Sequence, residues 1–556
     1  MTDSAREPDS NGNERLSRGD SFAWLHALPD HALQLLTSTF WLRWGMHFAT
    51  LAAVVVSATV VWGTWHIVRT PYAVECVEPG MVQMVDRVLQ GKPLYVQPAL
   101  DYSPFPYGPG MFHAAAALVR AGADPLMALR WLNVAGMLLA CLATYLLARA
   151  WKASLPVALI AAMWPLLSNE ITGYFLGVAH SDGPYLAFLL LGFVALFRSE
   201  TWRGAVLAGV FFGLAIPFKQ SALMYGAFLG AAWLTVNWRQ ALIFGAATLT
   251  CAAPSLLPSI LHNDVWAQFW LFKFASDFPF HPAGIALLGR GLLGREAIAV
   301  GLTVVGIVLV RQNGEADRAR RMLAIAIAAW VPSQLLIMGV AYANSYFPAT
   351  AVAGAGLAMG LTEIGNIAPS ATPRMRLLRG VLPLLALFQV LALIHDTNKL
   401  AGKPEQLAAW QTYVTWLQAA PGEVIVTDDR WTPRLTQHPL TASDTVVGAL
   451  GVAPHKGLPE AVRLTEAILA KIKVDRPIAV VTYSWASNMD ADSDYVYIGP
   501  LNTATQWGPS IGSTGYVWQV FLRKDHALGV SARTQSVMTR LQKGETIGWP
   551  TSALQR

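Results

Sequence analysis

Charged residues are scarce in this sequence. Asp, Glu, Lys and Arg make up 13% of its 556 residues, whereas apolar residues make up 54%. Soluble domains carry about 25% charged residues, so this composition excludes an ordinary soluble protein. Long apolar runs predict a polytopic α-helical membrane protein instead. The lipid bilayer is therefore the first expected partner, and no nucleic-acid partner is expected.

Cysteine is equally rare. Cys76, Cys141 and Cys251 lie far apart in the chain, which excludes a disulfide framework or a cysteine metal cluster. A cleavable signal peptide is not evident either. The first apolar segment starts after about forty polar or amphipathic residues and lacks an A-x-A-like exit. We expect this segment to be a signal anchor.

The N-terminal residues 1–43 read as a cytoplasmic tail. The tail ends in SFAWLHALPDHALQLL, an amphipathic stretch that suits a membrane surface. Arg15, Arg18 and Arg43 precede the first apolar run, and Arg69 alone follows it directly. Because Lys and Arg concentrate on the cytoplasmic side, this asymmetry places the N-terminus inside.

The apolar runs predict a transmembrane domain over residues 44–396 with eleven spans. These are 45–68, 127–149, 154–172, 182–197, 203–216, 219–236, 240–259, 284–310, 320–341, 346–364 and 377–395. Every short connection then assigned to the cytoplasm is basic, as the positive-inside rule requires. The basic residues in these connections are Arg149, Lys152, Arg198, Arg203, Arg239, Arg311, Arg318, Arg320, Arg321, Arg374, Arg376 and Arg379.

An odd number of spans places residues 397–556 outside the membrane. The segments GEVIVTDDR, RPIAVVTYSW and GYVWQVFLRK read as strands, and LPEAVRLTEAILAKIKV reads as an amphipathic helix. Strands separated by a helix predict a small soluble α/β domain on the outer side. We expect it to cover the site or to help select the acceptor.

The first outer loop, residues 69–126, is unusually organised for a connection. It places Glu75 and Glu78 directly after the first span, in VECVEPG. From Glu78, EPGMVQMVDRVLQG predicts an amphipathic helix on the membrane surface that begins at Pro79 and stops at Gly91. A helix N-terminus favours an anion, yet Glu is a poor capping residue, so capping explains Glu78 badly. Two solvated loop acids are the alternative.

A proline and aromatic strip, KPLYVQPALDYSPFPYGPG, follows this helix and cannot be helical. We expect an extended, aromatic-lined wall. GMFHAAAALVRAGA comes next and predicts a short apolar helix that cannot span the bilayer. The loop thus combines a helix with an acid at its head, a rigid strip and a second helix, which is more typical of a functional site than of a linker.

The order of these features resembles the GT-C membrane glycosyltransferases. The resemblance rests on acids early in the first outer loop, a helix ending in G-x-x-x-Y, a Y-x-P strip, R-x-x-N at 130–133 and LLAR at 146–149. Within this superfamily, the sequence most resembles bacterial enzymes similar to the lipid A aminoarabinose transferases and to the protein O-mannosyltransferases of family 39. The resemblance implies a multi-pass protein of the bacterial inner membrane. It would transfer a sugar from a polyprenyl phosphate to a cell-envelope lipid, polysaccharide or protein on the outer, periplasmic face.

In that superfamily the catalytic acid lies near the start of the first outer loop, as Asp or an Asp-Glu pair. This chain has E-x-x-E instead, which leaves both Glu78 and Glu75 as candidate bases, with Glu78 preferred. Because a phosphate ester leaves as a stable anion, one base suffices for an inverting displacement, unlike the two carboxylates of a glycosidase. The site also needs positive charge for the phosphate.

Three basic residues are candidates for that charge. Lys219, in AIPFKQSALMY, lies at a helix break near membrane depth, where an ionisable group is a functional hypothesis by default. A similar K-Q-[ST] turn recurs in the superfamily, which implies a role at the lipid phosphate; a snorkelling lysine is the alternative. Arg290 and Arg295 lie near the outer end of the eighth span, with ordinary headgroup contacts as the alternative.

Further candidates are Asp182, Asn344 and Tyr346. Asp182 begins the fourth span, where the superfamily often has a second acid that contacts acceptor, donor sugar or metal; a helix cap is the alternative. Asn344 and Tyr346, in ANSYF, resemble an N-Y-F feature of the donor pocket, with an interfacial aromatic anchor as the alternative. Asp182 and the nearby His180 do not define a metal site. No metal ligands are therefore predicted, and a divalent metal ion is left open as a cofactor.

Two other functional classes compete with this interpretation. A secondary transporter also has buried acids and broken helices, but the odd span count, the lack of an inverted repeat, the organised outer loop and the large terminal domain argue against one. A non-catalytic scaffold for cell-envelope assembly is the third class. A lateral groove that opens at Glu78 would favour the enzyme.

Overall fold

The structure of the chain is a computed structural model. It describes residues 38–75, 77–261, 264–274, 294–340, 343–367, 373–395, 414, 417–418, 423–426, 459–482, 494–501 and 518–523. Residues 1–37 of the predicted tail at 1–43, with its amphipathic stretch, and Arg290 lie outside the described residues, whereas the end of that tail belongs to the first helix.

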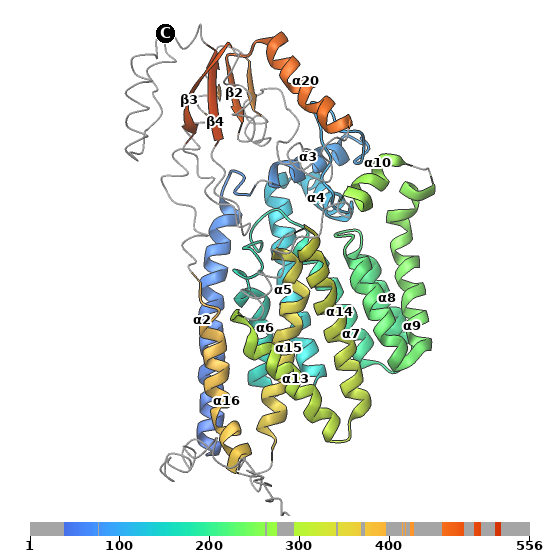
Figure 1. Cartoon of the computed structure of the whole chain (residues 1–556), viewed down its shortest axis with the longest axis vertical. Coiled ribbons are helices and arrows are strands. Elements are labelled where there is room, and N and C mark those ends of the chain that lie inside the picture. Colours follow the sequence, from blue (N-terminus) through green and yellow to red (C-terminus); the bar gives the residue numbers. More distant parts are fainter. Residues whose placement is uncertain are drawn as a thin grey trace, which may run out of the picture.

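Most of the described chain is a bundle of apolar helices (Figure 1). Within the described ranges, five stretches are long and apolar enough to cross a membrane. They lie in α2 (Thr39–Arg69), α5 (Pro125–Ala150), α9 (Ala222–Leu261), α14 (Ala316–Val340) and α15 (Phe347–Gly365) with the η4 turn (Ala343–Tyr346) before it. Shorter helices complete the bundle: α6 (Leu155–Leu167), α7 (Asp182–Arg198), α8 (Trp202–Ala215), α13 (Ala297–Gln312) and α16 (Pro373–Leu391).

Each predicted span overlaps one of these helices. The predicted spans 219–236 and 240–259 both fall on α9, where Asn237 departs from helical geometry with φ −156° and ψ 101°. A departure of that size interrupts a helix, so α9 consists of two helical pieces, as the sequence indicates. The break predicted near Lys219 is also present, because α8 ends at Ala215 and α9 begins at Ala222. The count of eleven crossings stays a prediction.

The upper end of the bundle in Figure 1 carries short helices. They are α3 (Glu78–Leu89), α4 (Gly110–Arg120), α10 (Val265–Gln268) and the single π-helical turn η2 (Phe269–Lys273). Met81, Val85 and Phe112 form a buried cluster there with Trp270. The predicted amphipathic helix is thus present as α3, and its polar residue Gln83 is buried and donates to the Asp101 carbonyl at 2.7 Å.

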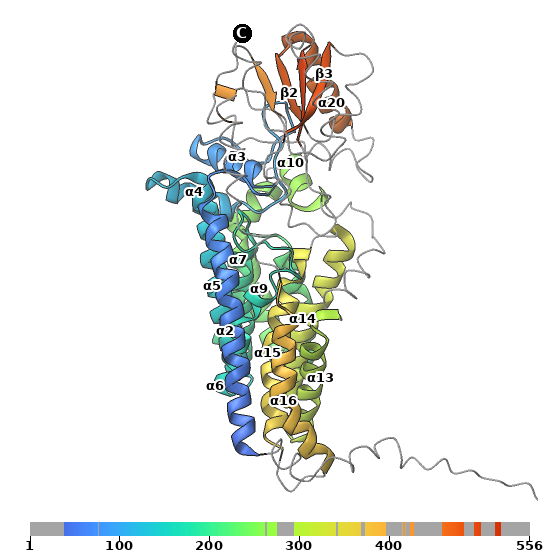
Figure 2. The same ribbon diagram turned by 90° about the vertical axis from the view of Figure 1, so that its left-hand side faces the viewer.

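A small sheet lies beyond this end (Figures 1 and 2). Its strands are β1 (Val424–Val426), β2 (Ala479–Thr482), β3 (Tyr495–Leu501) and β4 (Trp518–Arg523), in the order β1-β2-β4-β3, and α20 (Pro459–Asp475) precedes β2. β1 and β2 are parallel, and the other pairs are antiparallel. β1, β2, β4 and α20 coincide with the predicted elements, whereas β3 was not predicted. The assignment of residues 397–556 to a separate outer domain stays a prediction.

Helices α5 and α7 pack unusually closely near the upper end. A Cβ atom on Gly183 would lie 2.0 Å from the Asn133 carbonyl oxygen, and one on Gly136 would lie 2.1 Å from the Pro184 nitrogen. Only glycine fits at such distances, because any side chain would force the backbones apart. This close approach holds the first turn of α7, which begins at Asp182, against α5.

Candidate active site

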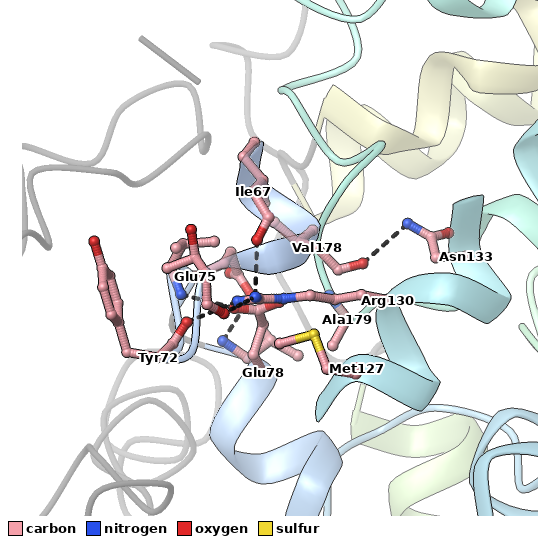
Figure 3. Close-up of polar contacts among 12 residues, drawn as sticks. Ile67, Tyr72, Glu75, Glu78, Met127, Arg130, Asn133, Val178 and Ala179 are labelled. Carbon is pink, nitrogen blue, oxygen red and sulfur yellow. Dashed lines mark hydrogen bonds and ion pairs between the residues drawn. The ribbon is translucent and has the colours of Figure 1, made fainter. Parts of the chain in front are cut away.

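A buried ion pair joins the first outer loop to α5 (Figure 3). Glu78, the first residue of α3, and Arg130, on α5, both have fully buried side chains. Arg130 donates from Nε to Glu78 Oε1 and from Nη2 to Glu78 Oε2, each at 2.7 Å. This two-point geometry is the strongest form of a carboxylate–guanidinium contact.

Arg130 also fixes the end of the first helix. Its Nη1 donates to the carbonyls of Ile67 and Thr70 at 2.9 and 2.6 Å, and its Nη2 donates to the Tyr72 carbonyl at 2.8 Å. A guanidinium has five N–H groups, and all five of Arg130 are therefore used. The end of α2 and the start of the outer loop are held to α5 by this one side chain.

The hydrogen-bond acceptor positions of the Glu78 carboxylate are also all used. Besides the two bonds from Arg130, Oε1 accepts from the Ala179 amide at 2.6 Å and Oε2 accepts from the Val74 amide at 2.7 Å. A carboxylate offers about four acceptor positions, and Glu78 fills them within the described residues. These contacts leave it no lone pair for a substrate proton.

Glu75 has a different environment. Its side chain turns back on the loop, where Oε2 accepts from the Val77 amide at 2.7 Å, and the residue is 8% exposed. Glu75 and Glu78 thus lie close together, as Figure 3 shows, and Glu78 is the residue whose bonds to Arg130 are seen. Nearby, burial raises the pKa of the Tyr72 hydroxyl, and the positive charge of Arg130 acts in the opposite direction.

One helical turn beyond Arg130, Asn133 holds a second loop. Its amide nitrogen donates to the carbonyls of Phe175 and Val178 at 2.7 and 3.0 Å, and its side-chain oxygen accepts from the Gly183 amide at 2.7 Å. The same loop reaches Glu78 through the Ala179 amide. Arg130 and Asn133 therefore anchor both the loop after α2 and the loop before α7 to one face of α5.

The residues that follow this loop form a second polar cluster. Asp182 is fully buried, and its Oδ1 accepts from Lys219 Nζ at 2.6 Å. Its Oδ2 accepts from Asn344 Nδ2 at 3.0 Å and lies 2.8 Å from His180 Nδ1. The Asp182 carboxylate is therefore contacted from the loop before α7, from the α8–α9 turn and from the η4 turn.

The proline and aromatic strip at residues 92–110 contacts this cluster. Tyr107, from the strip, has its hydroxyl 3.1 Å from His180 Nε2. Gln220 donates to the Pro106 carbonyl at 2.7 Å, and Gly110 donates its amide to the Pro217 carbonyl at 2.8 Å. The strip thus lies against the α8–α9 turn that carries Lys219, whose side chain stays 14% exposed. The arrangement offers a reachable cation beside a buried, hydrogen-bonded carboxylate.

Comparisons with known proteins identify the fold. The structure of an ArnT from Cupriavidus metallidurans in the apo state matches with a TM-score of 0.53 and 14% identity, covering 84% of this chain and 97% of that one. The same protein bound to undecaprenyl phosphate matches with a TM-score of 0.51 and 15% identity, with the same coverage. The chain has the GT-C fold. The resemblance to the GT-C glycosyltransferases is confirmed.

Two further comparisons agree with the GT-C fold. The archaeal oligosaccharyltransferase AglB from Archaeoglobus fulgidus, in complex with an inhibitory peptide and a dolichol-phosphate, matches with a TM-score of 0.51 and 14% identity, covering 81% of this chain and 70% of that one. The family model described as "Alpha-(1->6)-mannopyranosyltransferase, N-terminal domain" matches residues 94–237. No curated protein matches the sequence.

Besides Glu75 and Glu78, five predicted site residues lie in the described part of the chain, and three of these meet. Asp182, Lys219 and Asn344 meet in one cluster, although they are distant in sequence. Tyr346 is buried close by in sequence but accepts from Gln334 at 2.8 Å instead of joining the cluster. Arg295 lies apart from it and pairs with Glu170.

Some residues of these polar clusters were not predicted as site residues. Arg130 and Asn133 entered only as a motif, yet their spacing of three places both on one helix face, and this signal was available. Tyr107 was one of several aromatic residues in the strip, and no local signal distinguished it. Among the described residues, no group of three His, Cys, Asp or Glu side chains could hold a metal ion, so His180 and Asp182 have no third partner of that kind there.

Proposed function

We propose that this chain is a membrane glycosyltransferase that transfers a sugar from a polyprenyl phosphate to a cell-envelope acceptor on the outer face of the bacterial inner membrane. The observation that carries the proposal is the cluster of Lys219, Asp182 and Asn344. It combines a partly exposed cation with a buried carboxylate at the upper end of a GT-C bundle. A site for an anionic, lipid-borne substrate needs such a cation close to the membrane boundary.

The comparisons support a polyprenyl phosphate as carrier. The ArnT structure from Cupriavidus metallidurans is bound to undecaprenyl phosphate, and the AglB structure from Archaeoglobus fulgidus contains a dolichol-phosphate. The family model over residues 94–237 is described as a mannopyranosyltransferase. Polyprenyl-phosphate mannose is therefore the first donor to test.

Lys219 is the residue that we assign to the carrier phosphate. Its ammonium group donates to Asp182 Oδ1 and lies 5.7 Å from the centre of the Tyr185 ring. An ammonium has three N–H groups, and within the described residues one of them is used. The remaining donors and the 14% exposure of the side chain allow it to hold a phosphate oxygen.

We assign to Glu75 the role of the base that deprotonates the acceptor hydroxyl. Glu78 has four hydrogen-bond donors on its carboxylate, and taking a proton would break the pair with Arg130. Glu75 removes the proton of the acceptor hydroxyl while that oxygen bonds to the anomeric carbon. The bond from this carbon to the phosphate oxygen breaks, the carrier phosphate leaves with the electron pair, and the anomeric centre inverts.

The test is donor consumption by membranes that contain the protein. The membranes receive a panel of polyprenyl phosphates that carry radiolabelled sugars, beginning with mannose, and the release of the sugar from the lipid is counted. The parent should consume at least one donor. Glu75→Gln should lose about two to four orders of magnitude in rate, the usual effect of removing a general base, and Lys219→Ala should weaken donor binding. If the parent consumes no donor of the panel, the proposal is wrong.

A further inference from the structure

The polar cluster around Lys219 has little net charge. Lys219 carries one positive charge and Asp182 one negative charge, at an N···O distance of 2.6 Å. Asn344 adds none. With a neutral His180 the sum of these groups is zero, whereas a phosphate is bound best by a site with net positive charge. Protonation of His180 would give the cluster that charge.

His180 is placed to carry such a proton. Its Nδ1 lies 2.8 Å from Asp182 Oδ2, and its side chain is 2% exposed. The Asp182 carboxylate is close enough to attract a positive charge on the ring, although the contact does not have hydrogen-bond geometry. Histidine is also the side chain that exchanges its proton near neutral pH. The ring packs between Phe175 and Tyr107, with centroid distances of 4.8 and 5.1 Å.

The second ring nitrogen links the proton to the Tyr107 hydroxyl, 3.1 Å from Nε2. A neutral His180 with its proton on Nδ1 can only accept on Nε2, so Tyr107 must turn its O–H toward the ring. An imidazolium donates from both nitrogens. Tyr107 then accepts from Nε2–H, and its own proton becomes available to an anion.

We propose that His180 takes up a proton when the carrier phosphate binds beside Lys219, and that the Tyr107 hydroxyl then donates to a phosphate oxygen. The inference rests on the proposed function, because it deepens the carrier site. His180 and Lys219 together outweigh the charge of Asp182, and the site gains one positive charge for each phosphate that binds. His180 acts here as a positioning residue for Tyr107 and as a source of charge.

The groups that face His180 are consistent with this assignment. Asp182 on α7 contacts it directly, and Lys219 and Asn344 reach it through that carboxylate. Tyr107 faces it from the strip. The amide of Ala179, the residue before His180, donates to Glu78. Glu78 is paired with Arg130, so these two residues together add no net charge near His180. Among the charged groups that the structure describes, the carboxylate of Asp182 is the one in direct contact with the ring.

Calorimetry with the full-length protein in lipid nanodiscs tests the proposal. Undecaprenyl phosphate is titrated into the protein at about pH 7.5, where free histidine is mostly neutral, in two buffers that differ in ionisation enthalpy. The difference in heat gives the number of protons bound with the lipid. The parent should take up a large fraction of one proton, up to about one. His180→Gln should lose this uptake, whereas His113→Gln, which alters an exposed histidine of α4, should keep it.

A second readout guards against a misfolded variant. Tyr107→Phe keeps the ring, so it should retain proton uptake while binding the lipid several-fold more weakly. If the parent binds the lipid without proton uptake, or if His180→Gln takes up as many protons as the parent, the inference is wrong and the proposed function stands. If the parent does not bind undecaprenyl phosphate at all, the carrier assignment fails and the inference falls with it.

Discussion

Glu75 and Glu78 show how two like residues three positions apart acquire different roles. Glu78 is fully buried and shares its charge with Arg130, whereas Glu75 bonds to the Val77 amide at the edge of the loop. The preference for Glu78 as base is untested. The saturation of its carboxylate favours Glu75, the second candidate that the sequence leaves open.

The first prediction concerns the stability of this buried pair. Glu78→Gln should lower the free energy of unfolding by about 3–5 kcal/mol, because it leaves the Arg130 charge buried without its counterion. Glu75→Gln should cost about 1 kcal/mol, since an amide oxygen can still accept from Val77. Denaturation in detergent measures both. Replacing both partners, as Glu78→Leu with Arg130→Met, should not recover the loss, because the carbonyls and amides that the pair binds would then lose their partners. Equal stabilities for Glu78→Gln and Glu75→Gln would contradict this account.

A second prediction concerns Asn133, which bonds to the loop before α7. Asn133→Leu removes the partners of the buried Phe175 and Val178 carbonyls and of the Gly183 amide. Each group left unpaired costs about 1–3 kcal/mol. Hydrogen exchange of residues 175–183 should therefore become faster, while exchange in α9 should stay as in the parent. Unchanged exchange in this loop would show that Asn133 does not hold it.

At the scale of elements, α5 is the part of the fold that arranges the site. It carries Arg130 and Asn133, and its close packing on α7 positions Asp182.

The third prediction is that Gly183→Ala destabilises the protein by about 1–3 kcal/mol, because the added Cβ would lie 2.0 Å from the Asn133 carbonyl oxygen. Gly245→Ala is the matched control, since no atom lies within 4 Å of a Cβ there. The control should be neutral or slightly stabilising. Thermal unfolding measures both variants, and equal unfolding temperatures for Gly183→Ala and Gly245→Ala would contradict the prediction.

The elements themselves were largely predictable, because their signals are local. Apolar periodicity and the flanking Pro79 and Gly91 suffice to place α3. β3 escaped because Gly499 and Pro500 interrupt its apolar pattern; the structure accommodates them in an edge strand with an irregular register between Tyr497 and Gly499.

The contacts of the site were less predictable, because they are tertiary. Glu78 and Arg130 are 52 positions apart, and Lys219 and Asp182 are 37 apart. A sequence pattern identifies Arg130 and Asn133 as lying on one helix face, but it does not name the partner of either. The burial of Glu78 was missed for the same reason, since a residue just after a span reads as a surface residue.

At the scale of the whole molecule, the proposal requires the sheet and α3 to lie on the periplasmic side of the inner membrane. The fourth prediction uses single cysteines in a variant whose three native cysteines are replaced by Ala. Arg463→Cys on α20 and Asp317→Cys at the start of α14 are both exposed positions. In cells with an opened outer membrane, an impermeant maleimide should label position 463 and not 317. Labelling of position 317 and not of 463 would show that the topology is the reverse of the predicted one.

The most direct measurement is the release of carrier phosphate by the purified protein. Parent, Glu75→Gln and Glu78→Gln, each in nanodiscs and corrected for its folded fraction, receive the polyprenyl-phosphate sugar that the membranes consume, together with the cell-envelope acceptor. Our account predicts polyprenyl phosphate and inverted product from the parent, almost none from Glu75→Gln, and a residual rate from the folded fraction of Glu78→Gln. Full activity of Glu75→Gln, or a donor that stays intact with the parent, would contradict it.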